Sequence, residues 1–232
     1  MDSFVEKFNI FDLFTMLIPG IVISSLWSIS FSFQYYDKWI NCGNEKYVIF
    51  FVFSYMCGVI FHELGTIADI KFLYNILYGG KPREIFLLND KYKKFFNDEL
   101  SYKDALRIKD YFIDYLYINN IEESNTEQQK ELNSLIFAYC LNMSETNNLT
   151  RKSDKMIAIS EMSRSIFWGC LSTVLLNLYM IFRYSFHYKF YFAEIVVLLI
   201  LSLIFLFRKT RYEKYRLRIL LRIFLIHIKQ NS

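Results

Sequence analysis

Four long apolar stretches constrain the fold of this chain more than any other feature. They are FDLFTMLIPGIVISSLWSISFSF at 11–33, YVIFFVFSYMCGVIFHEL at 47–64, IFWGCLSTVLLNLYMIF at 166–182 and FYFAEIVVLLILSLIFLF at 190–207. A hydrocarbon core about 30 Å thick takes roughly 20 apolar residues of α-helix to cross. Because lipid offers the backbone no hydrogen bonds, only helices and closed barrels span it. The sequence therefore predicts an all-α integral membrane protein with four transmembrane helices.

The composition agrees with this class of protein. Of the 232 residues, 54% are hydrophobic and 19% are aromatic, which is more than an ordinary soluble domain carries. Only 2 prolines and 7 glycines are present, so the composition does not favour disorder or β-architecture. The chain begins MDSFVEKFNIFD and lacks the basic start of a secretory signal, so we expect the first stretch to remain in the mature protein.

The patterning divides the chain into four parts. We expect residues 1–66 to hold an N-terminal interfacial helix, formed by the amphipathic residues 2–9, and the first two transmembrane helices. Residues 67–165 form a helical cytoplasmic insertion between helices 2 and 3, residues 166–207 hold transmembrane helices 3 and 4, and residues 208–232 form a basic amphipathic cytoplasmic tail helix.

Pro19 poses a local question in the first stretch. Either the helix continues through Pro19 with a kink, or it breaks in front of Pro19, which then begins a new helix where its missing N–H costs nothing. A helix that starts at Pro19 is short for a full crossing. The continuous helix is therefore favoured, and both alternatives stay open at this point.

The distribution of Lys and Arg predicts the orientation. Of the 27 basic residues, 8 follow the fourth stretch, whereas Arg183 and Lys189 alone join the third stretch to the fourth. Basic residues near membrane helices are retained on the cytoplasmic side. We therefore expect both termini and the insertion to lie in the cytoplasm of a bacterium, with the protein in its inner membrane.

The insertion has a helical pattern. No helix breaker follows the second stretch until Gly79-Gly80-Lys81-Pro82, so that helix is expected to run to about residue 78. Two N-cap patterns then predict two further helices, one from Ser101 with a face of Ala105, Ile108, Phe112, Tyr115 and Leu116, and one from Ser124 with a face of Leu132, Leu135, Ile136, Tyr139 and Met143. A loop is expected at 144–153, with Ser153 capping a helix that continues into the third stretch.

Small and polar residues recur at four-residue steps within three of the apolar stretches. The sets are Gly20, Ser24, Ser28 and Ser32; Ser54, Gly58, His62 and Thr66; and Ser165, Gly169, Thr173 and Asn177. Each set lies on one helix face, where small side chains let backbones approach and hydroxyls bond across helices. One interpretation is a packed bundle, and the other is that a face lines a water-filled path in an oligomer.

The sequence offers no motif for catalysis, a cofactor or a metal. His62-Glu63 begins an H-E-x-x-H pattern, but position 66 is Thr. The four cysteines form no C-x-x-C pair. We therefore expect no enzyme activity and no cofactor or metal ion.

Glu194 is the one acidic residue well inside an apolar stretch. A carboxylate there is costly unless it is paired or hydrated, so such residues are candidates for function. Because Glu194 lies about one turn from the outer end of the stretch, an interfacial carboxylate paired with Lys189 or Arg183 is the alternative.

The tail carries a basic stripe. Arg208, Arg211, Lys214, Arg218 and Arg222 follow one another at steps of 3, 3, 4 and 4, beside an apolar stripe of Tyr212, Tyr215, Ile219, Ile223 and Ile226. Such a helix is expected to bind the anionic inner leaflet of the bilayer, with a soluble cytoplasmic protein as the alternative partner. The insertion has 15 acidic and 14 basic residues, and this balance does not favour nucleic acid.

This architecture resembles the small membrane subunits of bacterial anti-phage defence systems, such as the membrane component of Kiwa or the membrane accessory proteins beside Cas13b. The resemblance covers the arrangement of helices and rests on no motif. It implies a homo-oligomer that senses disturbance of the envelope or depolarises the membrane in response to a cytoplasmic signal or partner. A membrane anchor or sensor subunit for a soluble effector is the alternative, and a small transporter or lipid-handling protein is a third.

Overall fold

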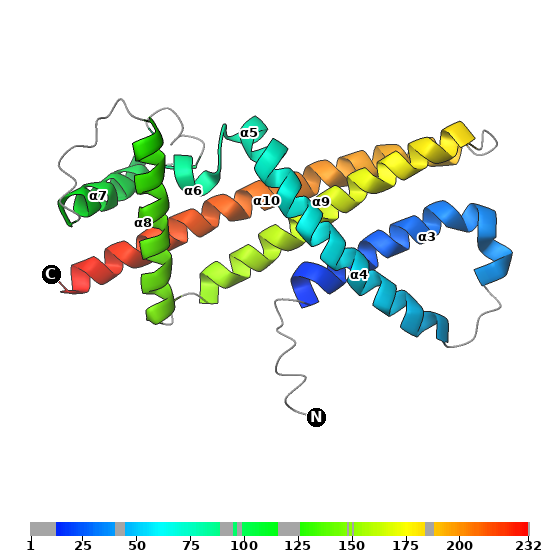
Figure 1. Cartoon of the computed structure of the whole chain (residues 1–232), viewed down its shortest axis with the longest axis horizontal. Helices are drawn as coiled ribbons and strands as arrows, with labels where there is room; N and C mark the ends of the chain where they lie inside the picture. Colours follow the sequence, from blue (N-terminus) through cyan, green and yellow to red (C-terminus); the bar gives the residue numbers. More distant parts are fainter. Residues whose placement is uncertain are drawn as a thin grey trace. The chain divides into compact units, whose positions relative to one another are not determined.

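The computed structural model describes residues 13–39, 45–88, 95–96, 99–115, 126–147, 149, 151–183 and 188–231. Every element in these ranges is helical (Figure 1): η1 Leu13–Leu17, α3 Ile18–Trp39, α4 Glu45–Ala68, η2 Asp69–Leu73, α5 Tyr74–Leu77, α6 Pro82–Ile85, α7 Glu99–Tyr115, α8 Thr126–Thr146, α9 Arg151–Arg183 and α10 Tyr188–Asn231. The all-α prediction is confirmed for this part of the chain. The predicted interfacial helix at 2–9 lies outside it.

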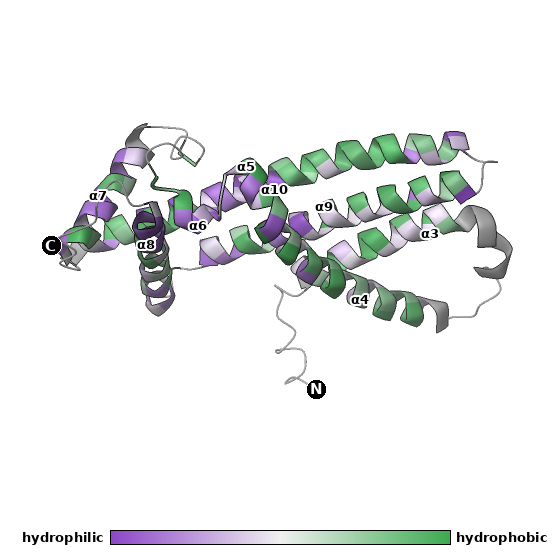
Figure 2. Cartoon of the chain, turned by 45° about the horizontal axis from the view of Figure 1, so that its top comes forward, coloured by the Kyte–Doolittle hydropathy of each residue, from purple (hydrophilic) through white to green (hydrophobic). Residues whose placement is uncertain are grey.

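Three helical stretches among the described residues are long and apolar enough to cross a membrane. They are Tyr47–Ile85, Arg151–Arg183 and Tyr188–His227. Hydrophobic residues dominate α4 and the first half of α10 (Figure 2). The first apolar stretch of the sequence forms a shorter apolar helix, Thr15–Phe31.

The distribution of side chains on these helices is the reverse of that in a soluble protein. Large apolar side chains such as Phe51, Phe192 and Phe207 are more than half exposed, and the polar side chains of Ser30 and Asn177 are fully buried. Exposed apolar side chains on this scale match a lipid environment, in which polar groups turn toward other helices. The fold therefore defines a membrane-embedded helical protein.

The chain forms two compact units. Unit 1 comprises residues 1–67 and 158–210, and unit 2 comprises residues 68–157 and 211–232. Helix α10 contributes its first half to unit 1 and its second half to unit 2. The described part of unit 1 thus contains residues 13–33 of the first apolar stretch and the other three stretches, and that of unit 2 contains α6, α7 and α8.

Helices α3, α9 and α10 share the apolar core of unit 1. The buried residues of this core are Ile166, Cys170 and Val174 from α9 with Ile195 and Leu198 from α10. Val22 and Leu26 of α3 pack against them. Ile166, Cys170 and Val174 are four positions apart and therefore lie on one face of α9, as expected for a period of 3.6 residues.

The helix is continuous through Pro19. The π-helical turn η1 runs directly into α3, so Pro19 is the second residue of the α-helical part. A local change to π-helical hydrogen bonding accommodates the N–H that proline lacks. Of the two alternatives at Pro19, the structure has the continuous helix.

Unit 2 has its own core, to which the tail contributes. Helix α8 packs against α6 and α7. The second half of α10 supplies buried Leu217, Leu220, Leu221 and Phe224 to the same core. Phe224 stacks on Phe112 of α7, with ring centroids 5.3 Å apart.

The predicted helix end at Gly79-Gly80 is confirmed. Helical structure continues from α4 through η2 and α5 to Leu77. Gly79 has φ of 76°, and the backbone N–H of both glycines bonds to the carbonyl of Tyr74. A residue with positive φ that satisfies the last carbonyls is a common helix C-cap.

Three details of the insertion differ from the sequence prediction. Ala105, Ile108 and Phe112 on α7 and Leu132 and Ile136 on α8 are buried as predicted, but α8 exposes Leu135 and Tyr139 and also buries Cys140. The buried face of α8, which packs against α6 and α7, is therefore shifted toward Cys140. The loop at 144–153 is shorter than predicted, because α8 extends to Thr146 and α9 begins at Arg151. Ser153 therefore lies within the first turn of α9 and is not its N-cap.

Candidate functional site

The most distinctive polar site of unit 1 lies where α3, α9 and α10 meet. Ser30 of α3 donates a hydrogen bond from Oγ to Oε1 of Glu194 on α10, at 3.1 Å. Tyr191, one turn earlier on α10, donates its hydroxyl to the Ser30 carbonyl at 3.4 Å. The amide of Asn177 on α9 also interacts with the Glu194 carboxyl. We call these four residues the Glu194 site.

The Glu194 site is buried and incompletely hydrogen-bonded. Asn177, Ser30 and Tyr191 expose at most 1% of their surface. Oε2 of Glu194 and both polar atoms of the Asn177 amide are buried without a well-formed hydrogen bond. Buried polar atoms are nearly always satisfied in native proteins, so an unpaired group marks strain, an unseen water or ion, or a role in function.

The chemistry of the Glu194 site is that of a carboxyl group with neutral partners. Ser, Asn and Tyr side chains can each donate and accept hydrogen bonds. No group of three or more His, Cys, Asp or Glu side chains that could hold a metal ion occurs among the described residues. The site therefore has the groups to bind a proton or a small cation.

The small-residue faces of α3 and α4 meet each other. A methyl group built on Gly20 would clash with the Ser54 carbonyl, and one built on Gly58 would clash with the Met16 carbonyl. Ser24 is buried. Ser28 bonds to the Ser24 carbonyl of its own helix, and the side chain of Ser32 lies outside the described residues. These helices thus approach within backbone contact inside one chain.

The small-residue face of α9 packs against α3. A methyl group on Gly169 would overlap the side chain of Ile23, which is fully buried. Ser165 and Thr173 are also fully buried, and each donates its hydroxyl to a carbonyl four residues earlier on α9. The predicted faces of α3, α4 and α9 therefore include residues in close intramolecular contact.

His62 has a partner that the sequence did not indicate. Nη2 of Arg164 lies 3.5 Å from Nδ1 of His62. Arg164 is only 7% exposed, and its side chain also lies next to Gly65. Arg164 directly precedes the small-residue set that begins at Ser165, and this position was the one sequence signal that could have drawn attention to it. Glu63, in contrast, is exposed.

The basic residues of the tail have separate environments. Arg208 is exposed and Lys214 is half-buried. Arg211 lies over the Tyr215 ring, with its guanidinium carbon 5.4 Å from the ring centroid. Arg218 donates from Nε to the Phe95 carbonyl at 3.1 Å.

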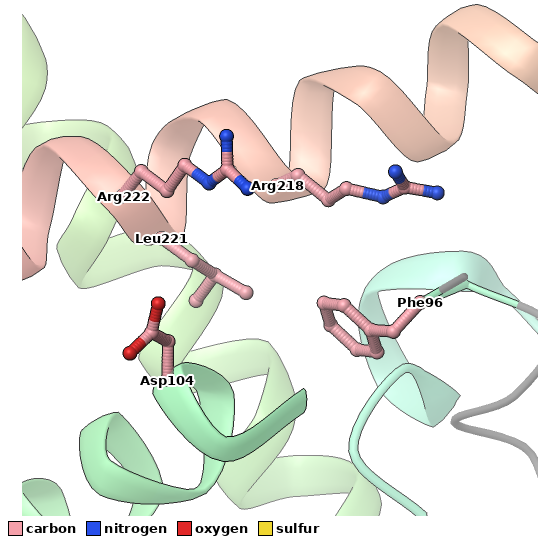
Figure 3. A pocket seen from close by; sticks show the side chains of 5 residues that line it. All are labelled: Phe96, Asp104, Arg218, Leu221 and Arg222. Atoms are coloured by element: carbon pink, nitrogen blue, oxygen red, sulfur yellow. The ribbon is translucent and has the colours of Figure 1, made fainter. Parts of the chain in front are cut away.

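Arg218 and Arg222 also line a small open pocket of unit 2 (Figure 3). Phe96, Leu221 and Asp104 complete its lining, and the enclosed volume is about 10 Å³, roughly the space for one water molecule. Ligand pockets usually enclose about 300 to 1,000 Å³. The pocket is therefore too small for most organic ligands, and the Asp104 carboxylate opposes an anion there.

The tail residues that pack in the core of unit 2 are not those of the apolar stripe. Ile226 is 57% exposed, whereas Leu217 and Leu220 are buried in the core of unit 2. Apolar residues surround most of this helix, so the pattern alone did not identify the side that packs. The tail packs on α7 and α8 through the face that carries Phe224, which contacts Phe112 and Tyr139.

Comparisons of the chain with protein-family models, with curated proteins and with solved structures find no match.

Proposed function

We propose that this chain is a non-enzymatic membrane protein whose cytoplasmic helical unit receives a signal or a soluble partner and whose membrane helices respond. In this proposal unit 2 is the receiving part and unit 1 is the responding part. The response is the opening of a membrane path or depolarisation of the membrane, and the setting is antiviral defence at a bacterial inner membrane.

The observation that supports the proposal most is the continuity of α10. It is one helix of 44 residues, Tyr188–Asn231. Its first half carries Glu194 and the apolar surface, and its second half carries Leu220 and Phe224 into the core of unit 2. Because an α-helix is stiff over this length, a change in the packing around Phe224 acts on the same helix that holds the Glu194 site.

We further propose that α3 crosses the membrane with the three longer helices. Its contacts at Gly20 and Gly169 place its small residues against α4 and α9, which is how transmembrane helices associate. Both termini then lie in the cytoplasm. The exposed apolar surfaces of α4 and α10 contact lipid or other copies of the chain in a homo-oligomer.

The experiment that tests this function measures ion flux through the full-length protein in liposomes. An imposed membrane potential, read by a voltage-sensitive dye, should collapse when the protein is present, and the detergent-solubilised particle should be an oligomer. The measurement is made without and with cell lysate, which supplies the cytoplasmic signal or partner, on the side of unit 2. A membrane potential that persists in both cases would overturn the proposal. That result together with a monomeric particle would favour a membrane anchor for a soluble effector.

A further inference from the structure

The Glu194 site brings unsatisfied polar atoms of two helices together. Oε2 of Glu194 and both Oδ1 and Nδ2 of Asn177 are buried without a well-formed hydrogen bond. Asn177 is 0% exposed, so water from outside does not reach its amide directly. The bonds from Ser30 and Tyr191 join α3 to the same site. A species that supplies hydrogen bonds to these atoms would stabilise the junction of three helices.

The Glu194 carboxyl group has no ion-pair partner among the residues that the structure describes. An isolated carboxylate in an apolar medium is strongly unfavourable unless it is paired. Within the described residues, no Lys, Arg or His forms an ion pair with Glu194. The charged groups nearest to the site along α9 and α10 are Arg183 and Lys189, both exposed, and the buried Tyr191 is uncharged. The buried cations of these helices, Arg164 and Lys209, lie 13 residues before Asn177 and 15 residues after Glu194. On α3 the first charged residues after Ser30 are Asp37 and Lys38, whose side chains lie outside the described residues.

We infer that the Glu194 site binds a single proton, held on the carboxyl group between Ser30 and Asn177. The proton on Oε2 is donated to Oδ1 of Asn177, which satisfies two of the three unpaired atoms with one bond. The single proton of the Ser30 hydroxyl has two acceptors, Oε1 of Glu194 and the Leu26 carbonyl, each 3.1 Å from Oγ, and in this state it is donated to Oε1. The oxygen and nitrogen of an amide are interchangeable by a flip of the side chain, so Asn177 can present either one to the carboxyl.

The same partners also accommodate release of the proton. When the carboxylate is ionised, the Asn177 amide presents Nδ2 to it, and the Ser30 hydroxyl remains a donor. A Lys or Arg partner would hold the group permanently ionised, whereas these neutral partners hold both states. Tyr191 keeps the Ser30 backbone in place through its bond to the carbonyl. The site therefore suits reversible protonation.

The position on α10 gives the proton a route. Glu194 lies six residues, or about 1.7 turns, after Tyr188, the first residue of the helix. The residue is half-buried, in contrast to the complete burial of Asn177. The inference does not depend on whether the protein conducts ions.

Carbodiimide labelling of the full-length wild-type protein tests the inference. Dicyclohexylcarbodiimide partitions into apolar sites and adds to protonated carboxyl groups, which it converts to a stable N-acylurea. We expect mass spectrometry to locate the adduct at Glu194. Above the titration midpoint of the group, its rate of formation should fall about tenfold for each pH unit, because each unit removes about nine-tenths of the remaining protonated form. Glu63, which is exposed on α4, is the internal control and should not retain the reagent at neutral pH.

Two further measurements separate the outcomes. Sodium ions at constant pH should leave the labelling rate unchanged, and protection by sodium would overturn the inference in favour of a metal-cation site. At a pH above the ordinary carboxyl range, where exposed Asp and Glu are ionised, the infrared band of a protonated carboxyl group should be larger in the wild-type protein than in Glu194→Gln. Absence of the adduct from wild-type protein at every pH would also overturn the inference, and this readout does not require a variant to fold.

Discussion

Gly20 of α3 and Gly58 of α4 bring two helix backbones into direct contact. A methyl group built on Gly20 would lie 2.9 Å from the backbone nitrogen of Gly58 and would overlap the Ser54 carbonyl. The Cβ atom of any other residue at position 58 would overlap the Met16 carbonyl. Small residues at such a crossing let membrane helices gain van der Waals contact, which is the main force between them in lipid.

This crossing predicts the effect of an alanine. Gly20→Ala is expected to lower the free energy of unfolding by about 1 to 3 kcal/mol, because a backbone cannot move aside as a side chain can. The midpoint of thermal unfolding in detergent, followed by tryptophan fluorescence, measures this loss. Gly65→Ala is the matched control, since its methyl group would meet side-chain atoms of Trp168 at 3.0 Å and Arg164 at 3.3 Å. Equal midpoints for the two variants would contradict the prediction.

The contact between Gly169 and Ile23 predicts a rescue. Gly169→Ala should destabilise unit 1 because its methyl group overlaps the buried Ile23 side chain. Ile23→Ala alone leaves a cavity, at a cost of about 2 to 5 kcal/mol. The double variant should be more stable than the sum of the two losses implies, by about 0.5 to 3 kcal/mol. Strict additivity in a double-mutant cycle would show that the two residues do not share this space.

The glycine contacts were within reach of the sequence, and the Glu194 site was only partly so. Four-residue spacing marks one face of a helix, and it identified Gly20, Gly58 and Gly169 without knowledge of which face each would meet. Glu194 and Asn177 were each singled out for separate reasons. Ser30 and Tyr191 were missed, because no periodicity within one helix indicates that a residue faces a carboxyl group on another.

The tail shows a different limit of the sequence. Its helix was predicted, but the sequence RLRILLRIFLIHI offers apolar residues on several sides. Only the shape of α7 and α8 selects Leu217, Leu220 and Phe224 for the core. Arg208, Arg211 and Arg222 remain exposed when the apolar residues of the tail pack in unit 2. Membrane binding by the basic stripe therefore stays a prediction.

Phe224 anchors the tail in unit 2, and its removal tests that role. Its ring stacks on Phe112 at 5.3 Å and meets Tyr139 edge to face at 5.7 Å. Phe224→Ala should cost about 3 to 5 kcal/mol through lost contacts and the cavity left behind. Amide hydrogen exchange of α7 and α8 should increase accordingly. Ile226→Ala, at a position that is 57% exposed, should change exchange little, and similar exchange in both variants would place the tail outside this core.

Cys140 predicts a dependence of stability on alkaline pH. Burial raises the pKa of this thiol from 9.0 to about 12. Between these values the unfolded chain releases the thiol proton and the folded chain keeps it, so the contribution to stability is complete below pH 9 and is lost as the pH rises to about 12. The loss is at most about 4 kcal/mol for a shift of this size.

The measurement compares wild-type protein with Cys140→Ala. Tyrosine and lysine titrate in the same range in both proteins, so their effects cancel in the difference. The free energy of unfolding of wild-type protein, minus that of Cys140→Ala, should be constant below pH 9 and should fall above it. A difference that stays constant over the whole alkaline range would show that the thiol is not buried in the folded state.

The orientation in the membrane can be tested with two single cysteines. In a background without the native cysteines, Lys189→Cys lies at the start of α10, and Ala138→Cys lies at an exposed position of α8 in unit 2. The excess of basic residues after α10 predicts that position 189 faces outward and position 138 faces the cytoplasm. A membrane-impermeant maleimide should therefore label Lys189→Cys in intact cells and should label Ala138→Cys only after the cells are lysed. The opposite pattern would place unit 2 outside and would remove the cytoplasmic partner from the proposed function. Labelling at both positions in intact cells would place both on the outer side, so the chain between them would cross the membrane an even number of times or not at all.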